Sequence, residues 1–178
     1  MSKVLIRKMR GEDLREVLNI EKLSNTIFDE FVGNYIIREE CWTRQDFLDA
    51  ANDKTNHCFV AEMLLKADPH RDVSWIYGSL IVSAQDGFWG TEHMSISPYA
   101  YKEIREAFTL HLIKLTNDEK YPRIYLTVRD DNYEELGFWT CKGFKPKLLR
   151  GKFGEQDGWL LRFGSMKPIP ANEVELTY

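Results

Sequence analysis

The chain has 178 residues, with 24 Lys and Arg against 28 Asp and Glu, so its formal net charge is −4. Hydrophobic residues make up 43% of it and aromatic residues 13%, which is typical of globular rather than disordered proteins. A chain of this length buries enough apolar surface to fold without a metal or a disulfide framework. The mild acidity argues against wholesale nucleic-acid binding. These quantities indicate one globular domain.

No apolar run approaches the roughly 20 residues that a membrane-spanning helix needs. Charge returns at Arg7 and Lys8, so we expect no secretory signal. The three cysteines are few and widely spaced, which favours a reducing compartment over a disulfide framework. We therefore expect a cytoplasmic protein without a membrane partner.

Hydrophobic patterns in the first half of the chain predict a strand, two helices and then three strands. Leu14, Val17 and Leu18 lie at helical spacing, and residues 43–46 resemble a capping box that opens a second helix. Residues 25–42 show no clear pattern. Turn-forming residues separate the three later runs, which favours an antiparallel meander. The predicted strands cover residues 4–6, 57–65, 75–84 and 91–97.

The second half begins with the clearest helix, residues 102–117, whose apolar side chains fall on one face. A short strand and another helix follow, and Gly143 is a natural residue at the end of that helix. Asp157-Gly158 then marks a hairpin. The predicted elements are a strand at 124–128, a helix at 132–142, hairpin strands at 148–153 and 159–163, and a surface tail at 165–178.

The order of these elements predicts an α/β (α+β) fold with a mixed, mostly antiparallel seven-stranded sheet. A strand, a helix and a strand over residues 91–128 indicate one parallel pair near the centre of that sheet. Helices are expected on both of its faces. We expect a single domain over residues 1–164, followed by the tail.

Three segments match one known arrangement of strands and helices. They are residues 6–18, where a strand leads into a helix; Ile96-Ser97-Pro98, before the amphipathic helix; and Asn132, followed by Gly143-Phe144. Together with the C-terminal hairpin, they resemble the GNAT superfamily, the acyl-CoA-dependent N-acyltransferases. The resemblance covers residues 4–163. It implies a GNAT-like fold and transfer of an acetyl group from acetyl-CoA to an amine of a small molecule or a protein.

In that family a loop of pattern Arg/Gln-x-x-Gly-x-Gly/Ala opens the helix after the fourth strand, and its backbone N–H groups bind the pyrophosphate of coenzyme A. The aligned segment here, residues 101–107, contains neither glycine and carries Glu103 and Glu106. Lys102 and Arg105 can offset these acids. In the family, a backbone amide of the fourth strand also polarises the thioester. The resemblance implies these cofactor-binding residues: Met94, Ile96, Tyr101, Lys102, Arg105, Ala107 and Asn132.

The resemblance also implies a base for the amine and an acid for the leaving thiolate. Glu92 and His93 are the base candidates, and we expect them on opposite faces of the strand, so that at most one lies in the cleft. The family's acid is a Tyr four residues before the Gly-Phe pair. This chain has Trp139 there, and an indole cannot serve as that acid. Tyr133 is the substitute candidate for the acid.

Other functions remain open. Five basic residues lie between Lys142 and Lys152 without an acid among them, which predicts either a solvated strand face or a site for an anionic partner, such as a cofactor phosphate or a nucleic acid. The missing glycines and tyrosine also resemble inactive, phage-encoded members of the fold, some of them virion parts. The alternatives are therefore a catalytically inactive binding or structural protein, for example a virion component, and a nucleic-acid-modifying enzyme. His57-Cys58 lacks a second ligand pair, so we expect no metal site.

Overall fold

The computed structural model describes residues 3–29, 34–37, 41–68, 71–117, 119–129, 132–153 and 156–164. The predicted tail, residues 165–178, lies outside these described residues.

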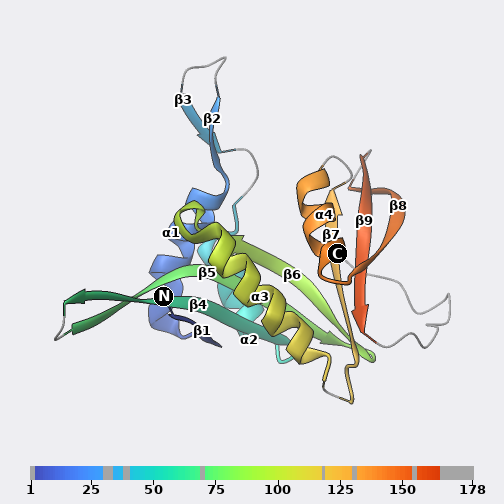
Figure 1. Ribbon diagram of the computed structural model, residues 1–178, viewed down its shortest axis with the longest axis horizontal. Helices are drawn as coiled ribbons and strands as arrows, with labels where there is room; N and C mark the ends of the chain where they lie inside the picture. The colour runs from blue at the N-terminus through green and yellow to red at the C-terminus, as the bar shows by residue number, and fades with distance from the viewer. Residues whose placement is uncertain are drawn as a thin grey trace.

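Seven strands form one mixed sheet in the order β1-β4-β5-β6-β7-β9-β8 (Figure 1). Every neighbouring pair is antiparallel except β6 and β7, which are parallel. The predicted sheet with its single parallel pair is thus confirmed. The strands are β1 (Lys3–Lys8), β4 (Asn56–Asp68), β5 (Arg71–Gln85), β6 (Phe88–Ile96), β7 (Arg123–Arg129), β8 (Lys145–Phe153) and β9 (Gln156–Gly164).

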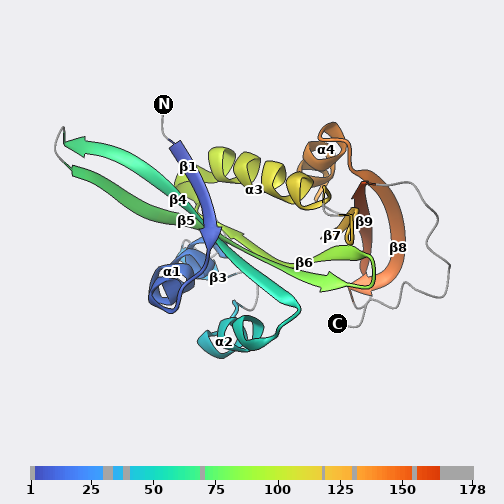
Figure 2. The same ribbon diagram turned by 90° about the horizontal axis from the view of Figure 1, so that it is seen from below.

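The described residues include four helices, which cover both faces of the sheet as predicted. Figure 2 shows α1 and α2 on one face and α3 and α4 on the other. Within the described ranges, each helix is too short or too polar to span a lipid bilayer. The helices are α1 (Leu14–Ser24), α2 (Arg44–Asn52), α3 (Tyr101–Leu115) and α4 (Tyr133–Cys141), with 3-10 turns at Gly11–Asp13 and Pro98–Ala100.

A second, two-stranded sheet follows α1, in the segment where the sequence showed no pattern. Its strands are β2 (Thr26–Asp29) and β3 (Asn34–Ile37), which pair antiparallel with each other. Figure 1 shows this hairpin extending away from the end of α1, well clear of the main sheet. Because residues 25–42 showed no clear pattern, the sequence analysis did not predict this hairpin.

Alternate residues of the central strands face opposite helix layers, because successive side chains of a strand point to opposite faces. On β4, Phe59 and Ala61 belong to the core on the α3 side, whereas Val60 packs with α1 and α2. Ile104 and Phe108 of α3 are completely buried in the first of these cores. The near-continuous apolar runs of the sequence are thus explained by a sheet that is covered on both faces.

Local signals determine where two of the helices begin and end. The Thr43 hydroxyl accepts a hydrogen bond from the backbone N–H of Asp46, so the predicted capping box is present at the start of α2. The Asn132 side chain accepts one from the Glu135 N–H at 3.2 Å and caps α4. Gly143 follows α4 with a φ of 92°, a left-handed conformation that favours glycine.

The parallel strands β6 and β7 separate soon after they meet. They pair only at Trp89 with Ile124 and at Gly90 with Tyr125. Beyond these residues β6 continues to Ile96 and β7 to Arg129, and each keeps its other neighbour in the sheet. The sheet is therefore opened between two of its central strands.

Candidate functional site

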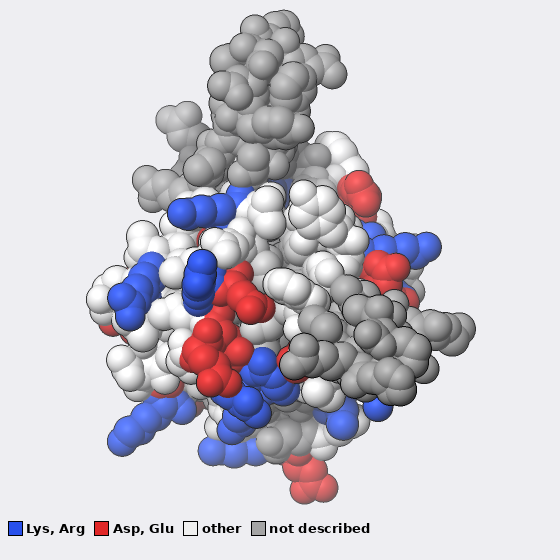
Figure 3. Space-filling model, turned by 90° about the vertical axis from the view of Figure 1, so that its left-hand side faces the viewer, with Lys and Arg blue, Asp and Glu red and all other residues white. Residues whose placement is uncertain are grey.

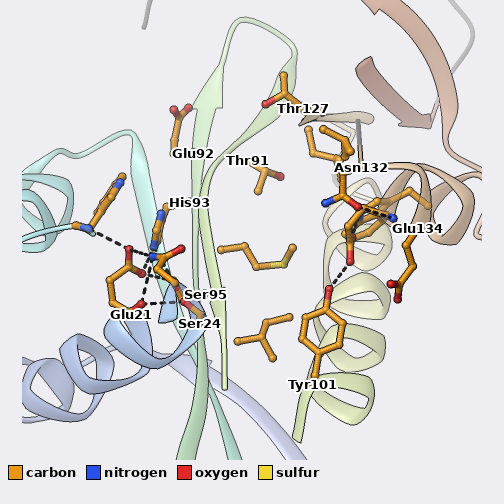
Figure 4. Close-up of a pocket in the computed structure, with 18 of the residues that line it drawn as sticks. Glu21, Ser24, Thr91, Glu92, His93, Ser95, Tyr101, Thr127, Asn132 and Glu134 are labelled. Carbon is orange, nitrogen blue, oxygen red and sulfur yellow. Dashed lines mark hydrogen bonds and ion pairs between the residues drawn. The ribbon is translucent and has the colours of Figure 1, made fainter. Parts of the chain in front are cut away.

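A cleft of about 790 Å³ occupies the opening between β6 and β7. In Figure 4, Glu21 and His93 lie on one side of β6, while Tyr101, Asn132 and Glu134 lie across the cleft on the side of α3 and α4. The lining residues are Glu21, Ser24, Asn25, Trp42, Thr91, Glu92, His93, Met94, Ser95, Ile96, Pro98, Tyr101, Leu126, Thr127, Val128, Asn132, Glu134, Glu135 and Trp139. Among the described residues of this lining there is no Lys and no Arg.

A β-bulge changes the orientation of the two base candidates. Val82 of β5 pairs with Thr91 and Ile81 pairs with His93, so Glu92 is the extra residue on β6. A bulge disturbs the strict alternation of side chains along a strand. Both Glu92 and His93 consequently line the cleft. The expectation that at most one of them would do so is wrong, because it assumed a regular strand.

His93 is hydrogen-bonded to a buried acid that the sequence analysis did not single out. Its Nε2 lies 2.8 Å from Oε2 of Glu21 in α1 and 3.0 Å from the Ser95 hydroxyl oxygen. The Ser95 hydroxyl also donates to Glu21 Oε2. Figure 4 shows these groups meeting at the interface between α1 and β6. The imidazole is therefore held at the cleft wall by contacts from two elements.

The side chain of Glu21 is only 1% exposed, and its carboxylate is hydrogen-bonded to four neighbouring groups. Oε1 accepts from the Trp42 backbone N–H and from the Asn25 amide, both at 3.0 Å. Burial alone would raise the pKa of the Glu21 carboxyl, but the hydrogen bond with His93, with those of the other donors, holds that pKa below its ordinary value. The buried position has a sequence signal, since an acid that follows Leu14, Val17 and Ile20 lies on the apolar face of the helix.

Two aromatic rings hold the imidazole in place. Trp42 stacks on His93 with ring centroids 4.3 Å apart and an interplanar angle of 23°. Phe47 of α2 contacts His93 edge-on at 5.6 Å. The side chain of His93 is 14% exposed, so one part of the ring still reaches the cleft. Rotation of the ring is therefore restricted by packing on two sides.

The opposite wall of the cleft is built around Glu135 of α4. Its carboxylate accepts from Arg105 Nη1 at 2.7 Å, from the Tyr101 hydroxyl and from the Trp139 indole N–H at 2.8 Å. The Arg105 guanidinium also lies 4.0 Å from the centre of the Phe138 ring. Burial and the Glu135 carboxylate raise the pKa of Tyr101 above its ordinary value. This network joins the start of α3 to α4.

The remaining cofactor-binding and acid candidates lie at different places. Asn132 lines the cleft and Figure 4 shows it facing the gap. Tyr133 is 75% exposed and is not among the lining residues. Lys102 is exposed in the first turn of α3, and Ala107 is half-buried one turn further on. Neither of these two side chains lines the cleft.

Two sets of backbone N–H groups are directed at the cleft or next to it. The Ser97 N–H donates to the Tyr77 carbonyl of β5 at 2.8 Å. Because backbone groups alternate along a strand, the N–H groups of Met94 and Ile96 lie on the other edge of β6, which faces the opening. The N-cap residue of α3 is Ala100, so the first-turn N–H groups of that helix have no side-chain cap.

Charged side chains also lie outside the cleft. On the face shown in Figure 3, basic and acidic side chains lie beside one another. In the predicted basic stretch, Lys142 pairs with Glu106 of α3, while Lys145 and Lys147 are exposed on β8. Among the described residues, no three His, Cys, Asp or Glu side chains are grouped so that they could hold a metal ion.

Solved structures match the whole architecture. The ribosomal-protein-S18-alanine N-acetyltransferase from Escherichia coli is 15% identical, with a TM-score of 0.67 over 99% of both chains. Ard1 from Thermoplasma volcanium is 14% identical, with a TM-score of 0.65 over 92% of this chain and 99% of its own. A mutant of the spermidine N-acetyltransferase SpeG from Vibrio cholerae is 16% identical, with a TM-score of 0.63 over 90% and 93%.

No protein-family model matches the chain, and no curated protein matches it in sequence. Because the solved structures are only 14–16% identical to this chain, the similarity to them extends to the fold alone. The chain therefore has a GNAT-like fold, as its sequence predicted.

Proposed function

We propose that the protein is an N-acetyltransferase that transfers the acetyl group of acetyl-CoA to a primary amine. The observation that carries this proposal is the early separation of β6 and β7. It leaves the N–H groups of Met94 and Ile96 facing a cleft that is also lined by the His93 imidazole of the same strand. Acyl transfer to an amine requires a hydrogen-bond donor that stabilises the negative carbonyl oxygen and a base that accepts the proton of the amine. Here one short strand carries both.

The residues of the cleft fit the arm of acetyl-CoA, that is, the part of the cofactor that carries the thioester. Its walls carry apolar side chains on both strands, Met94 and Ile96 on β6 and Leu126 and Val128 on β7. The Asn132 amide at the start of α4 is available as a donor to a polar group of that arm. Such a mixture of apolar walls and a few polar groups is typical of cofactor sites.

In this proposal the pyrophosphate of coenzyme A binds at the N-terminus of α3, although the two glycines of the family's loop are missing. Ile104, at one of the two glycine positions, is completely buried against Gly78 and does not enter the cleft. Glu106, at the other, pairs with Lys142, which directly follows α4. The first-turn amides, the helix dipole and exposed Lys102 then favour an anion there.

Acetyl-CoA supplies an activated acyl thioester when bound, and the protein supplies positioning, a base and hydrogen-bond donors. An amine of ordinary pKa, about 10.4, is mostly protonated at neutral pH, so it first loses one proton to solvent and then attacks as the neutral amine. His93 accepts the proton that the amine loses as its nitrogen bonds to the acyl carbon and the carbon–sulfur bond breaks. The N–H groups of Met94 and Ile96 stabilise the negative charge on the carbonyl oxygen. Water protonates the thiolate, because the Trp139 indole is bound to Glu135 and does not titrate usefully.

One observation favours a second candidate function, a catalytically inactive binding or structural protein such as a virion component. Glu134 and Glu135 both line the α4 side of the cleft, and they oppose an anionic ligand. Arg105 lies 2.7 Å from Glu135 and 3.8 Å from Glu134 and offsets part of this charge. The two candidates therefore differ in whether acetyl-CoA binds at all.

The test is the melting temperature of the protein with and without millimolar acetyl-CoA. A ligand at 100 times its Kd adds about 2.7 kcal/mol to the free energy of unfolding, which gives a clear increase. Lys102→Glu should reduce the increase, whereas Lys114→Glu, at the far end of the same helix, should preserve it. Arg105 is left unchanged, because its bond to Glu135 makes a substitution there a test of folding instead. No increase with the unaltered protein would favour the inactive candidate.

A further inference from the structure

We infer that Glu21 is a positioning residue that holds His93 in one tautomer, with the proton on Nε2, so that Nδ1 is the atom that accepts the proton of the amine. The catalytic part of this inference rests on the proposed function. The tautomer itself does not, because it follows from the hydrogen bonds around Glu21.

The Glu21 carboxylate is surrounded by hydrogen-bond donors. Two of its neighbours can only donate to it, the Trp42 N–H and the Asn25 NH₂ group, and the Ser95 hydroxyl donates to it as well. A carboxylate with two oxygens accepts all of these bonds only when it is ionised, since a protonated oxygen would itself need an acceptor. Glu21 is therefore an acceptor at every one of its bonds.

The imidazole of His93 must donate to this carboxylate. His93 Nε2 lies 2.8 Å from Glu21 Oε2, and an acceptor at that distance requires a proton on the nitrogen. A neutral imidazole carries one N–H, so Nδ1 must then be the unprotonated nitrogen with a free lone pair. Among the described residues, no hydrogen bond occupies Nδ1. The nitrogen left for the substrate is thus the one that can accept a proton.

The alternative orientation of the His93 ring is unfavourable. A half-turn of the imidazole would replace Nε2 with a carbon atom and leave Glu21 without its closest donor. Trp42 stacked at 4.3 Å and Phe47 at 5.6 Å hold the plane of the ring. Packing therefore fixes the plane of the ring, and the hydrogen bond to Glu21 selects which edge of it faces the carboxylate.

Ser95 does not turn this group into a nucleophilic triad. In such a triad the hydroxyl and the acid bind different nitrogens of the imidazole. Here Ser95 and Glu21 both bind Nε2, and Ser95 is 3% exposed. Its hydroxyl instead donates to Glu21, which helps to keep the carboxylate in place.

The tautomer can be measured directly by nitrogen-15 NMR of the histidine side chains, at a pH where His93 is neutral and with the resonance assigned through His93→Gln. The expected result is a protonated Nε2 and an unprotonated Nδ1. An Nδ1–H tautomer in the unaltered protein would overturn the inference whatever the outcome of activity measurements.

The variant Glu21→Gln tests the consequence for the reaction. Glutamine offers one acceptor oxygen and brings an N–H₂ donor against existing donors, so the Nε2–H tautomer loses its preference. We expect kcat to fall at least tenfold with little change in KM for acetyl-CoA, in line with the typical contribution of a positioned base. Glu16→Gln makes the same chemical change on an exposed position of the same helix and should retain kcat.

Two results separate this inference from the proposed function. In the His93→Gln background, Glu21→Gln should cause no further loss of kcat, because a residue that acts through another is non-additive with it. A further tenfold loss there, or a folded Glu21→Gln variant with full kcat, would overturn the positioning role alone. Absence of acetyl-CoA binding to the unaltered protein overturns the proposed function and leaves the tautomer measurement valid.

Discussion

Glu21 and His93 lie 72 positions apart in the sequence, yet Glu21 Oε2 and His93 Nε2 are 2.8 Å apart at the interface of α1 and β6. The carboxylate belongs to the helix layer and the imidazole to the sheet. The pair therefore joins the side wall of the cleft to the strand that carries the proposed acyl-transfer groups.

This pair should make the stability of the protein depend on pH. The pKa of Glu21 in the folded protein is lower than its ordinary value of 4.5, because the His93 contact and the other donors outweigh burial. The unfolded state then binds the proton more readily, so the contribution of Glu21 to stability is full above about pH 4.5 and is lost as the pH falls through the folded pKa. Urea unfolding between pH 7 and pH 3 measures this dependence. It should be weaker in Glu21→Gln and unchanged in Glu16→Gln; equal slopes in all three proteins would contradict the assignment.

The contact between β5 and α3 leaves no room for a side chain at Gly78. A Cβ atom there would lie 2.7 Å from Ile104 Cγ2 and 2.8 Å from Phe108 Cε2. We expect Gly78→Ala to lower the free energy of unfolding by about 1–3 kcal/mol, as overpacked cores do. Gly137→Ala is the matched control, because nothing lies within 4 Å of a Cβ at that exposed position of α4. It should raise stability by about 0.5–1 kcal/mol, and a loss of stability there as large as at Gly78 would contradict the packing argument.

Arg105 is a structural residue of the α3–α4 contact in this account. Its side chain is 13% exposed, is bonded to Glu135 and lies over the Phe138 ring. Arg105→Ala should therefore lower the free energy of unfolding by about 1–3 kcal/mol, the range for lost hydrogen bonds to charged groups. The neighbouring exposed substitution Lys102→Ala should change it by less than about 0.5 kcal/mol. Chemical denaturation of both variants measures the difference, which would be absent if Arg105 were free to bind the cofactor.

Asn132 has two roles that substitutions can separate. Its side-chain oxygen caps α4, whereas its amide nitrogen is available in the cleft. Asn132→Ser keeps a capping oxygen and should preserve stability, while Asn132→Ala should cost about 1 kcal/mol. Both remove the amide donor and should raise the Kd for acetyl-CoA by about 3- to 10-fold, the equivalent of one hydrogen bond. If calorimetric titration gives the same Kd for the serine variant as for the unaltered protein, the arm does not contact Asn132.

The parts of the fold that the sequence predicted well have local causes. The capping box at Thr43 and the left-handed Gly143 act within a few residues of themselves, so their patterns are readable along the chain. The helix 102–117 and the strands around it follow from hydrophobic periodicity. The order of these elements was sufficient for the mixed sheet and its parallel pair.

The parts that the sequence did not predict depend on single insertions or on distant partners. The bulge at Glu92 adds one residue to β6, and one residue is enough to turn a side chain to the other face. Glu21 was missed because its partners come from β6 and from the segment before α2. The hairpin of β2 and β3 forms a separate two-stranded sheet, and residues 25–42 showed no sequence pattern that would have predicted it.

The central claim, that the opening between β6 and β7 binds acetyl-CoA, is tested most directly by NMR of nitrogen-15-labelled protein during titration with acetyl-CoA. The account predicts that the largest changes occur in the backbone N–H signals of Met94 and Ile96, on the free edge of β6, and of Tyr101 to Glu103, in the first turn of α3. Unchanged signals at both places in millimolar acetyl-CoA would contradict it.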